Sequence, residues 1–266
     1  MSTPSAPPPQ YTAPGNGAQS SEPLLVPGEA PPRRQEDDNI PDDFKYSTSV
    51  AECTLPIRHA FLRKVYTILF GQLVVTAAVG AVISQNSSVS HWVLTHIWTF
   101  YVAIFGAMGL MIGAYVKQRS YPTNMLFLGG FTLLESYCVG IISSLYDTKI
   151  VIQAVVLTLV IFGGLSLFAL QTKYDFSGWQ SYLGAALWGL IGFGLISIFM
   201  PYSSGVELAY SVVGALVFAG YIVVDTQLIM RRYHPEDEVA AAIALYLDII
   251  NLFLNILRIL NEMNRD

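Results

Sequence analysis

Residues 150–170 read IVIQAVVLTLVIFGGLSLFAL, a run of 21 residues without a charged side chain. A helix needs about 20 apolar residues to cross the hydrocarbon core of a bilayer, because every backbone amide must be hydrogen-bonded within the helix. The run therefore predicts a transmembrane helix. The whole chain of 266 residues is 53% hydrophobic and only 12% charged, which is too apolar for one soluble domain.

Six further apolar runs lie on either side of this one, and short connections between them hold most of the remaining polar residues. The predicted fold is an all-α integral membrane protein in which residues 46–266 form a bundle of seven transmembrane helices. The seventh run contains several polar residues, so the sequence leaves open whether it crosses the bilayer or re-enters. The predicted spans are 65–84, 92–116, 124–145, 150–170, 182–200, 206–230 and 239–260.

Residues 1–45 have a different composition, since they hold ten of the fourteen prolines together with Gly, Ser, Gln and acidic residues. Such a segment cannot bury enough apolar surface to offset its chain entropy, and we predict a disordered cytosolic tail. Pro8, Pro9 and Tyr11 belong to a PPxY sequence within it. This tetrapeptide could bind a WW-domain ubiquitin ligase as a polyproline II helix, although a proline-rich tail also produces it by chance.

The positive charges that flank the spans predict the orientation, because Lys and Arg resist translocation. Nine of them lie before span one or after spans two, four and six, which is one side of an antiparallel bundle. The loops between spans on the opposite side hold only Lys149. The N-terminus is therefore predicted to be cytosolic. The nine residues are Lys45, Arg58, Arg63, Lys64, Lys117, Arg119, Lys173, Arg231 and Arg232.

Three carboxylates, Glu135, Asp225 and Asp248, fall well within predicted spans. Each costs about 2.5–3.5 kcal/mol at the centre of a membrane helix, so they must face the interior of the bundle. In the seventh span, Asp248, Asn251 and Asn255 follow one another at spacings of three and four, which places them on one stripe of the helix. We expect this stripe to line a cavity or a helix contact.

Asp225 and Asp248 are candidates for a proton-sharing pair, since their depths from the cytosolic side differ by only ~6 Å at ~1.5 Å per residue. Two carboxylates ~4 Å apart repel by ~4 kcal/mol at an effective dielectric constant near 20. A shared proton would hold the two helices together, and its loss would separate them and offer ligands to Ca²⁺. The alternative is that each aspartate pairs with a basic residue, for which Arg119, Arg231 and Arg258 are candidates.

The sequence predicts no enzyme, no cofactor and no nucleic-acid partner, because it contains no G-x-S-x-G, Walker or zinc-protease pattern and its acidic residues crowd into the tail. An intramembrane aspartyl protease would also use two aspartates on consecutive late helices, one as acid and one as base. Such proteases carry Gly-x-Gly-Asp at the second aspartate, where this chain reads Leu245-Tyr246-Leu247-Asp248. The protease is therefore the least favoured interpretation.

Several longer strings point to one family. They are Asp43-Phe44-Lys45-Tyr46, Ile57-Arg58-His59-Ala60-Phe61-Leu62-Arg63-Lys64-Val65-Tyr66, Phe131-Thr132-Leu133-Leu134-Glu135, Val224-Asp225-Thr226-Gln227 and Leu245-Tyr246-Leu247-Asp248-Ile249-Ile250-Asn251-Leu252-Phe253-Leu254. Together they resemble the transmembrane Bax inhibitor motif family, in its Lifeguard branch with the Golgi anti-apoptotic proteins. The resemblance covers the chain after the tail, and the tail itself looks fungal.

The resemblance implies a seven-helix bundle, a pH-sensitive Ca²⁺ leak from internal stores, and protection against cell death through lowered store Ca²⁺. It implies that Asp225 and Asp248 form the pH sensor and gate and contact Ca²⁺ transiently. It also implies a basic latch residue at the end of span two, here Arg119 or Lys117. Further candidates for an ion path are Glu135, Glu207, Asn251 and Asn255.

Two other functions remain open. A H⁺-coupled Ca²⁺ exchanger would use the same carboxyl groups, and a non-conducting regulator would bind cell-death or stress-signalling proteins. The family branch favours the Golgi and endoplasmic reticulum membranes, and a tail that binds a WW-domain ligase would allow delivery to the vacuolar membrane.

Overall fold

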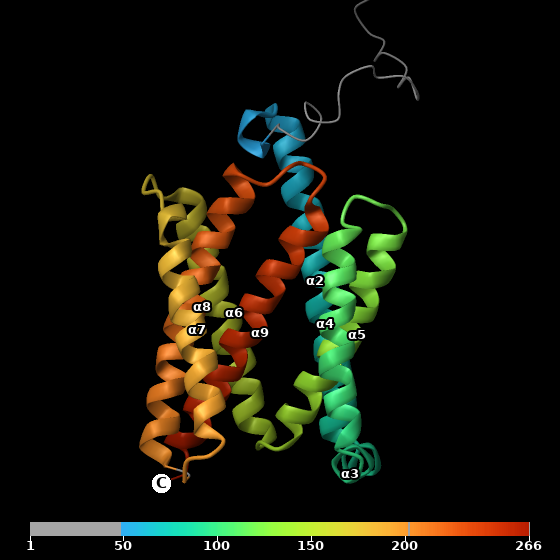
Figure 1. The fold of residues 1–266 in the computed structure, drawn as a ribbon, viewed down its shortest axis with the longest axis vertical. Coiled ribbons are helices and arrows are strands. Elements are labelled where there is room, and N and C mark those ends of the chain that lie inside the picture. The colour runs from blue at the N-terminus through green and yellow to red at the C-terminus, as the bar shows by residue number, and fades with distance from the viewer. Residues whose placement is uncertain (1–48, 202, 266) are drawn as a thin grey trace, which may run out of the picture. The chain divides into compact units, whose positions relative to one another are not determined.

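The computed structural model describes residues 49–201 and 203–265, and every regular element within them is helical, as predicted (Figure 1). Among these residues, seven helices are long and apolar enough to cross a membrane, namely α2 and α4 to α9. The predicted tail, with Pro8, Pro9 and Tyr11, lies outside the described residues. The elements are η1 (Val50–Glu52), α2 (Leu55–Gln85), α3 (Ser87–Thr95), α4 (Trp98–Val116), α5 (Thr123–Ser144), α6 (Thr148–Gln171), η2 (Ser177–Trp179), α7 (Gln180–Ser197), α8 (Ser204–Arg231) and α9 (Glu238–Met263).

Two helix boundaries differ from the hydropathy pattern. Helix α2 begins ten residues before the predicted span, with Pro56 in its first turn. Backbone amides of the first turn have no hydrogen-bond partner within the helix, so a proline costs no hydrogen bond there. The predicted second span divides into α3 and α4. Asn86 starts α3, because its side-chain oxygen accepts hydrogen bonds from the backbone of Ser88 and Val89 at 3.1 and 3.3 Å.

Helix α9 is the central helix of the bundle. In its most apolar stretch 78% of the residues are buried, whereas the corresponding shares for α6 and α7 are 17% and 11%. It packs against α2, α4, α5, α6 and α8, and Figure 1 shows it running between them. Three successive alanines, Ala240, Ala241 and Ala242, lie fully buried near its start and let neighbouring backbones approach closely. The helix with the most polar residues is thus shielded from lipid by the others.

Helix α9 also runs the whole length of the bundle. Its first residue, Glu238, pairs with Lys64 of α2 at 3.4 Å. In its last turn, Glu262 accepts a hydrogen bond from Ser204 of α8 at 2.8 Å. Since α8 is antiparallel to α9, these contacts lie at opposite ends of the bundle. The seventh span therefore crosses and does not re-enter. We call the two ends of the bundle, after the connections found there, the α8–α9 end and the α7–α8 end.

A buried hydroxyl network sets the position of α9 against α2 and α5. The Thr76 hydroxyl lies 2.8 Å from the Tyr246 hydroxyl and 2.9 Å from that of Ser136, and Gln72 donates to Thr132 at 3.0 Å. Tyr246 is fully buried. Because buried polar groups favour the one arrangement that satisfies them, the network fixes the rotation and height of α9 two residues before Asp248.

Candidate functional site

The structure brings together the two aspartates of the last two helices. Asp225 of α8 and Asp248 of α9 lie close enough for their carboxyl groups to interact. Asp248 is only 6% exposed, and Asp225 is partly buried beside it. Helices α8 and α9 are antiparallel and pack along their lengths, so residues before the connection meet residues after it. We refer to Asp225 and Asp248 as the carboxyl pair.

The interaction of two neighbouring carboxyl groups depends on whether they carry a proton. Within the described part of the chain, no donor reaches Oδ2 of Asp248. A carboxylate only accepts hydrogen bonds, so two carboxyl groups can bond to each other only when one of them is protonated. Two negative charges ~4 Å apart would repel by about 4 kcal/mol at an effective dielectric constant near 20. A proton held between the groups would relieve this repulsion, as the proton-sharing pair predicted from the sequence requires.

Three tyrosines lie around the carboxyl pair. Tyr115 of α4, Tyr221 of α8 and Tyr233 of the α8–α9 connection all lie close enough to interact electrostatically with both aspartates. Burial raises the pKa of Tyr233, and the nearby charge of Asp225 raises it further. The Tyr233 hydroxyl therefore stays protonated at physiological pH. The backbone oxygen of Tyr233 accepts a hydrogen bond from Val50 at 2.9 Å, so the buried residue Val50 packs over this connection.

Gln227 holds α8 in register near the carboxyl pair. Its side chain is 1% exposed, accepts a hydrogen bond from the backbone of Phe176 and donates one to the backbone of Tyr174, both at 2.8 Å. These bonds join α8 to the connection between α6 and α7. Sequence reasoning overlooked this role, although an uncharged amide two residues after Asp225 in an apolar run is itself a signal of a buried polar contact.

The predicted latch residue contacts a different carboxylate. Arg119, in the connection between α4 and α5, donates from Nε to Oδ1 of Asp237 at 2.8 Å and from a terminal nitrogen to Oδ2 at 3.1 Å. Asp237 stands directly before α9. Lys117, the other candidate, is exposed at the end of α4. Arg119 is thus attached to the start of α9, and sequence reasoning missed Asp237 as its partner.

The other two arginines considered as counter-charges also have partners elsewhere. Arg231 pairs with Asp175 at 3.3 Å, and Arg258 hydrogen-bonds to Tyr146 near the α7–α8 end. These contacts do not support the alternative in which each aspartate of the carboxyl pair is neutralised by its own arginine.

The candidate ion-path residues fall into two places. Asn251 and Asn255 line a cavity of about 150 Å³ between α7, α8 and α9, together with Arg258, and Glu207 lies near Tyr146 at the α7–α8 end. Glu135 does not join them, because it lies on α5 beside Cys138 and Tyr246. Of the stripe predicted on the seventh span, Asn251 and Asn255 therefore line a cavity, whereas Asp248 is not among the lining residues and Glu135 stands apart.

A resident metal site is not formed by these groups. In the described ranges, no cluster of three or more His, Cys, Asp and Glu side chains could hold a metal ion. The carboxyl pair offers at most four of the six to eight oxygens that Ca²⁺ takes.

Comparison with known proteins adds independent findings. The family model described as "Inhibitor of apoptosis-promoting Bax1" matches residues 58–266. The chain is 41% identical to Bax inhibitor 1 of Schizosaccharomyces pombe over 225 residues, which covers 85% of each protein. It is 39% identical to protein lifeguard 4 of Mus musculus and 41% identical to the Golgi anti-apoptotic protein of Vaccinia virus strain Lister. Both of these matches span 227 residues, 85% of this chain and 95% of the relative.

Proposed function

The chain belongs to the Bax inhibitor family, and from this premise we propose that it is a pH-sensitive Ca²⁺ leak channel of an internal membrane that protects against cell death. The observation that carries the proposal is the buried contact between Asp225 and Asp248. The names of its relatives, Bax inhibitor and Golgi anti-apoptotic protein, support the protective role. The protein performs no covalent chemistry in this proposal.

The carboxyl pair acts as the gate. With one shared proton it joins α8 to the central helix α9. When the proton leaves, a repulsion of about 4 kcal/mol favours separation of the helices by about a thousandfold. Both carboxylates then become ligands for a hard cation, and the cavity lined by Asn251 and Asn255 continues the path toward the α7–α8 end. Rising pH therefore opens the channel.

The charges favour an orientation with the α8–α9 end in the cytosol. The basic residues beside α2, α4, α6 and α8 gather at this end, and positive charges are retained on the cytosolic side. The relatives named for the Golgi support a Golgi or endoplasmic reticulum membrane. Recruitment of a WW-domain ligase by Pro8, Pro9 and Tyr11 stays a prediction and would permit a vacuolar location.

A H⁺-coupled Ca²⁺ exchanger is the second candidate, because the same contact lets protons and Ca²⁺ compete for one pair of carboxyl groups. The non-conducting regulator and the intramembrane protease are less favoured functions, since neither uses a pH-dependent separation of α8 and α9. A regulator would act through cell-death or stress-signalling partners.

Ca²⁺ flux from liposomes containing the full chain tests the proposal. Flux should rise between pH 5 and pH 8, and it should depend on the pH itself and not on a difference in pH across the membrane. An exchanger would instead follow an imposed proton gradient. A protein that passes no Ca²⁺ at any pH, while a co-reconstituted channel of known activity does, would refute both transport functions.

A further inference from the structure

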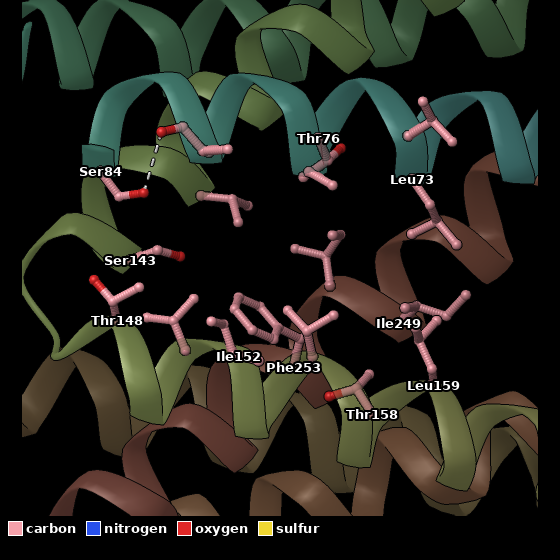
Figure 2. A pocket seen from close by; sticks show the side chains of 18 of the residues that line it. Leu73, Thr76, Ser84, Ser143, Thr148, Ile152, Thr158, Leu159, Ile249 and Phe253 are labelled. Atoms are coloured by element: carbon pink, nitrogen blue, oxygen red, sulfur yellow. Dashed lines mark hydrogen bonds between the residues drawn. The ribbon is translucent and has the colours of Figure 1, made fainter. Parts of the chain in front are cut away.

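A groove of about 400 Å³ opens on the side of the bundle between α2 and α6 (Figure 2). Residues of α5 and α9 form its floor. Its rims are exposed apolar side chains, among them Phe70 and Val74 of α2 and Ile152 and Leu159 of α6, each at least 50% exposed. The groove therefore faces the hydrocarbon of the bilayer and not the two aqueous sides.

The polarity of the groove changes along its length. Ser84, Ser143 and Thr148 bring three hydroxyl groups to one end, and Leu73, Leu159 and Ile249 line the other (Figure 2). The Ser84 hydroxyl also donates to the backbone oxygen of Ala81, at a long distance of 3.4 Å. The two remaining hydroxyls do not make the apolar end polar. Thr158 donates to the backbone of Ala154 at 2.7 Å, and Thr76 is engaged with Tyr246 in the core.

The length of the groove matches one leaflet. The lining residues span about 22 Å of α2, from Phe70 to Gln85, and about 16 Å of α6, from Thr148 to Leu159, at ~1.5 Å per residue, and half of a ~30 Å hydrocarbon core is about 15 Å. Gln85 is the last residue of α2 and Thr148 the first of α6, so the hydroxyl end lies at the α7–α8 end of the bundle. The groove thus runs from the middle of the membrane to one interface.

The volume decides what kind of molecule fits. A transmembrane helix 10–12 Å wide would fill on the order of 1,400 Å³ over this length, so it could only lie across the opening. A single hydrocarbon chain fits the space, and leaving the groove empty would forfeit the dispersion contacts of its walls. A molecule with one apolar chain and a polar group at its end matches both the volume and the polarity.

We infer that the groove binds one acyl chain of a glycerophospholipid, with the ester and headgroup region at Ser84, Ser143 and Thr148. The chain lies along α2 and α6 and contacts Ile249, the residue next to Asp248, on the central helix. This site is separate from the carboxyl pair and does not depend on ion transport.

Photo-crosslinking of the full chain in phosphatidylcholine vesicles tests the position and direction of the chain. A diazirine at the end of the acyl chain should label peptides containing Leu73, Leu159 or Ile249. A diazirine near the ester should label those containing Ser143 or Thr148. Equal labelling by both probes over all lipid-facing helices, or the reverse order, would overturn the inference.

Lipid retention tests the binding itself, with a control one residue away. Ala77 lines the groove, whereas the neighbouring residue Ala78 is exposed and does not. In native mass spectrometry from mild detergent, the retained phospholipid should fall about tenfold in Ala77→Phe and remain in Ala78→Phe. Retention that is equal in both variants would contradict the site, and so would retained ergosterol in place of phospholipid from mixed vesicles. Should Ala77→Phe not fold, Val155→Phe in the groove and Val156→Phe outside it repeat the comparison on α6.

Discussion

The guanidinium of Arg119 and the carboxylate of Asp237 form a two-bond ion pair, with N–O distances of 2.8 and 3.1 Å. Asp237 directly precedes α9, and about 16 Å of helix rise separates it from Asp248. The ion pair therefore anchors the beginning of the central helix and leaves the carboxyl pair to titrate on its own. It ties the α4–α5 connection to the helix that, in our proposal, moves when the gate opens.

Removing this anchor should favour the open state. The two side chains are 27% and 15% exposed, so after allowance for screening by solvent the pair contributes about 1 kcal/mol. In Arg119→Gln, Ca²⁺ flux at pH 5, where the carboxyl pair holds its proton, should rise about fivefold. Asp237→Asn should give the same increase, and the double variant should add little to either one. Liposome flux measures all three, with Lys117→Gln as the control for lost positive charge.

An increase in Lys117→Gln equal to that in Arg119→Gln would show that general charge is responsible and not this ion pair. Fully additive effects of Arg119→Gln and Asp237→Asn would show that the two residues act separately.

Replacing either member of the carboxyl pair should remove the pH dependence of flux. In Asp225→Asn or Asp248→Asn the amide can donate to the remaining carboxylate, so the contact no longer needs a proton. Flux should stay at its low-pH level from pH 5 to pH 8. Asp175→Asn is the matched control, because Asp175 is an exposed aspartate at the same end of the bundle. A preserved pH profile in both pair variants would disprove the gate.

Tyr233 should not contribute to that profile, although it lies beside the pair. Its pKa is raised above the ordinary value near 10, so its hydroxyl keeps the proton throughout the range from pH 5 to pH 8. A raised tyrosine pKa changes stability only where the group ionises, which lies above pH 10. Tyr233→Phe should therefore leave the midpoint of the flux profile in place. A displaced midpoint would mean that the hydroxyl bonds to one charge state of the carboxyl pair.

Gly214 should be intolerant of a side chain. A Cβ atom at this position would overlap the Asn255 side chain, so α8 and α9 could not keep their spacing beside the cavity. Gly214→Ala should destabilise the protein by about 1–3 kcal/mol, as overpacking does elsewhere. Thermal unfolding in detergent measures this as a lowered Tm. Gly205→Ala, at an open position near the start of the same helix, should leave the Tm unchanged or slightly raised.

The sequence was sufficient to predict the seven crossings, because each depends on local composition alone. It also directed attention to Asp225 and Asp248, since carboxylates in apolar helices must face inward, and their role as a gate stays a prediction. It could not show that α9 is the central helix. Hydropathy measures how apolar a segment is, whereas the contacts of α9 depend on which helices surround it.

Contacts between residues on different helices could not be predicted from the sequence, for a related reason. The charge of Arg119 was evident, but only the fold brings it to Asp237, 118 residues further along the chain. Glu135 was grouped with Asn251 and Asn255 because all are polar residues in spans, and the fold places it on another helix. The break between α3 and α4 was missed because residues 92–116 form one apolar run in the sequence, and hydropathy does not register a change of helix direction within such a run.

The full crossing of α9 has a practical effect on reporters attached to this protein. Arg265 stands at the α7–α8 end and Val50 at the other, so labels placed next to these two residues would be exposed to different compartments. With the α8–α9 end in the cytosol, a carboxyl-terminal fluorescent protein would report the acidity of the organelle interior. An amino-terminal one would be digested first when protease is added to sealed microsomes.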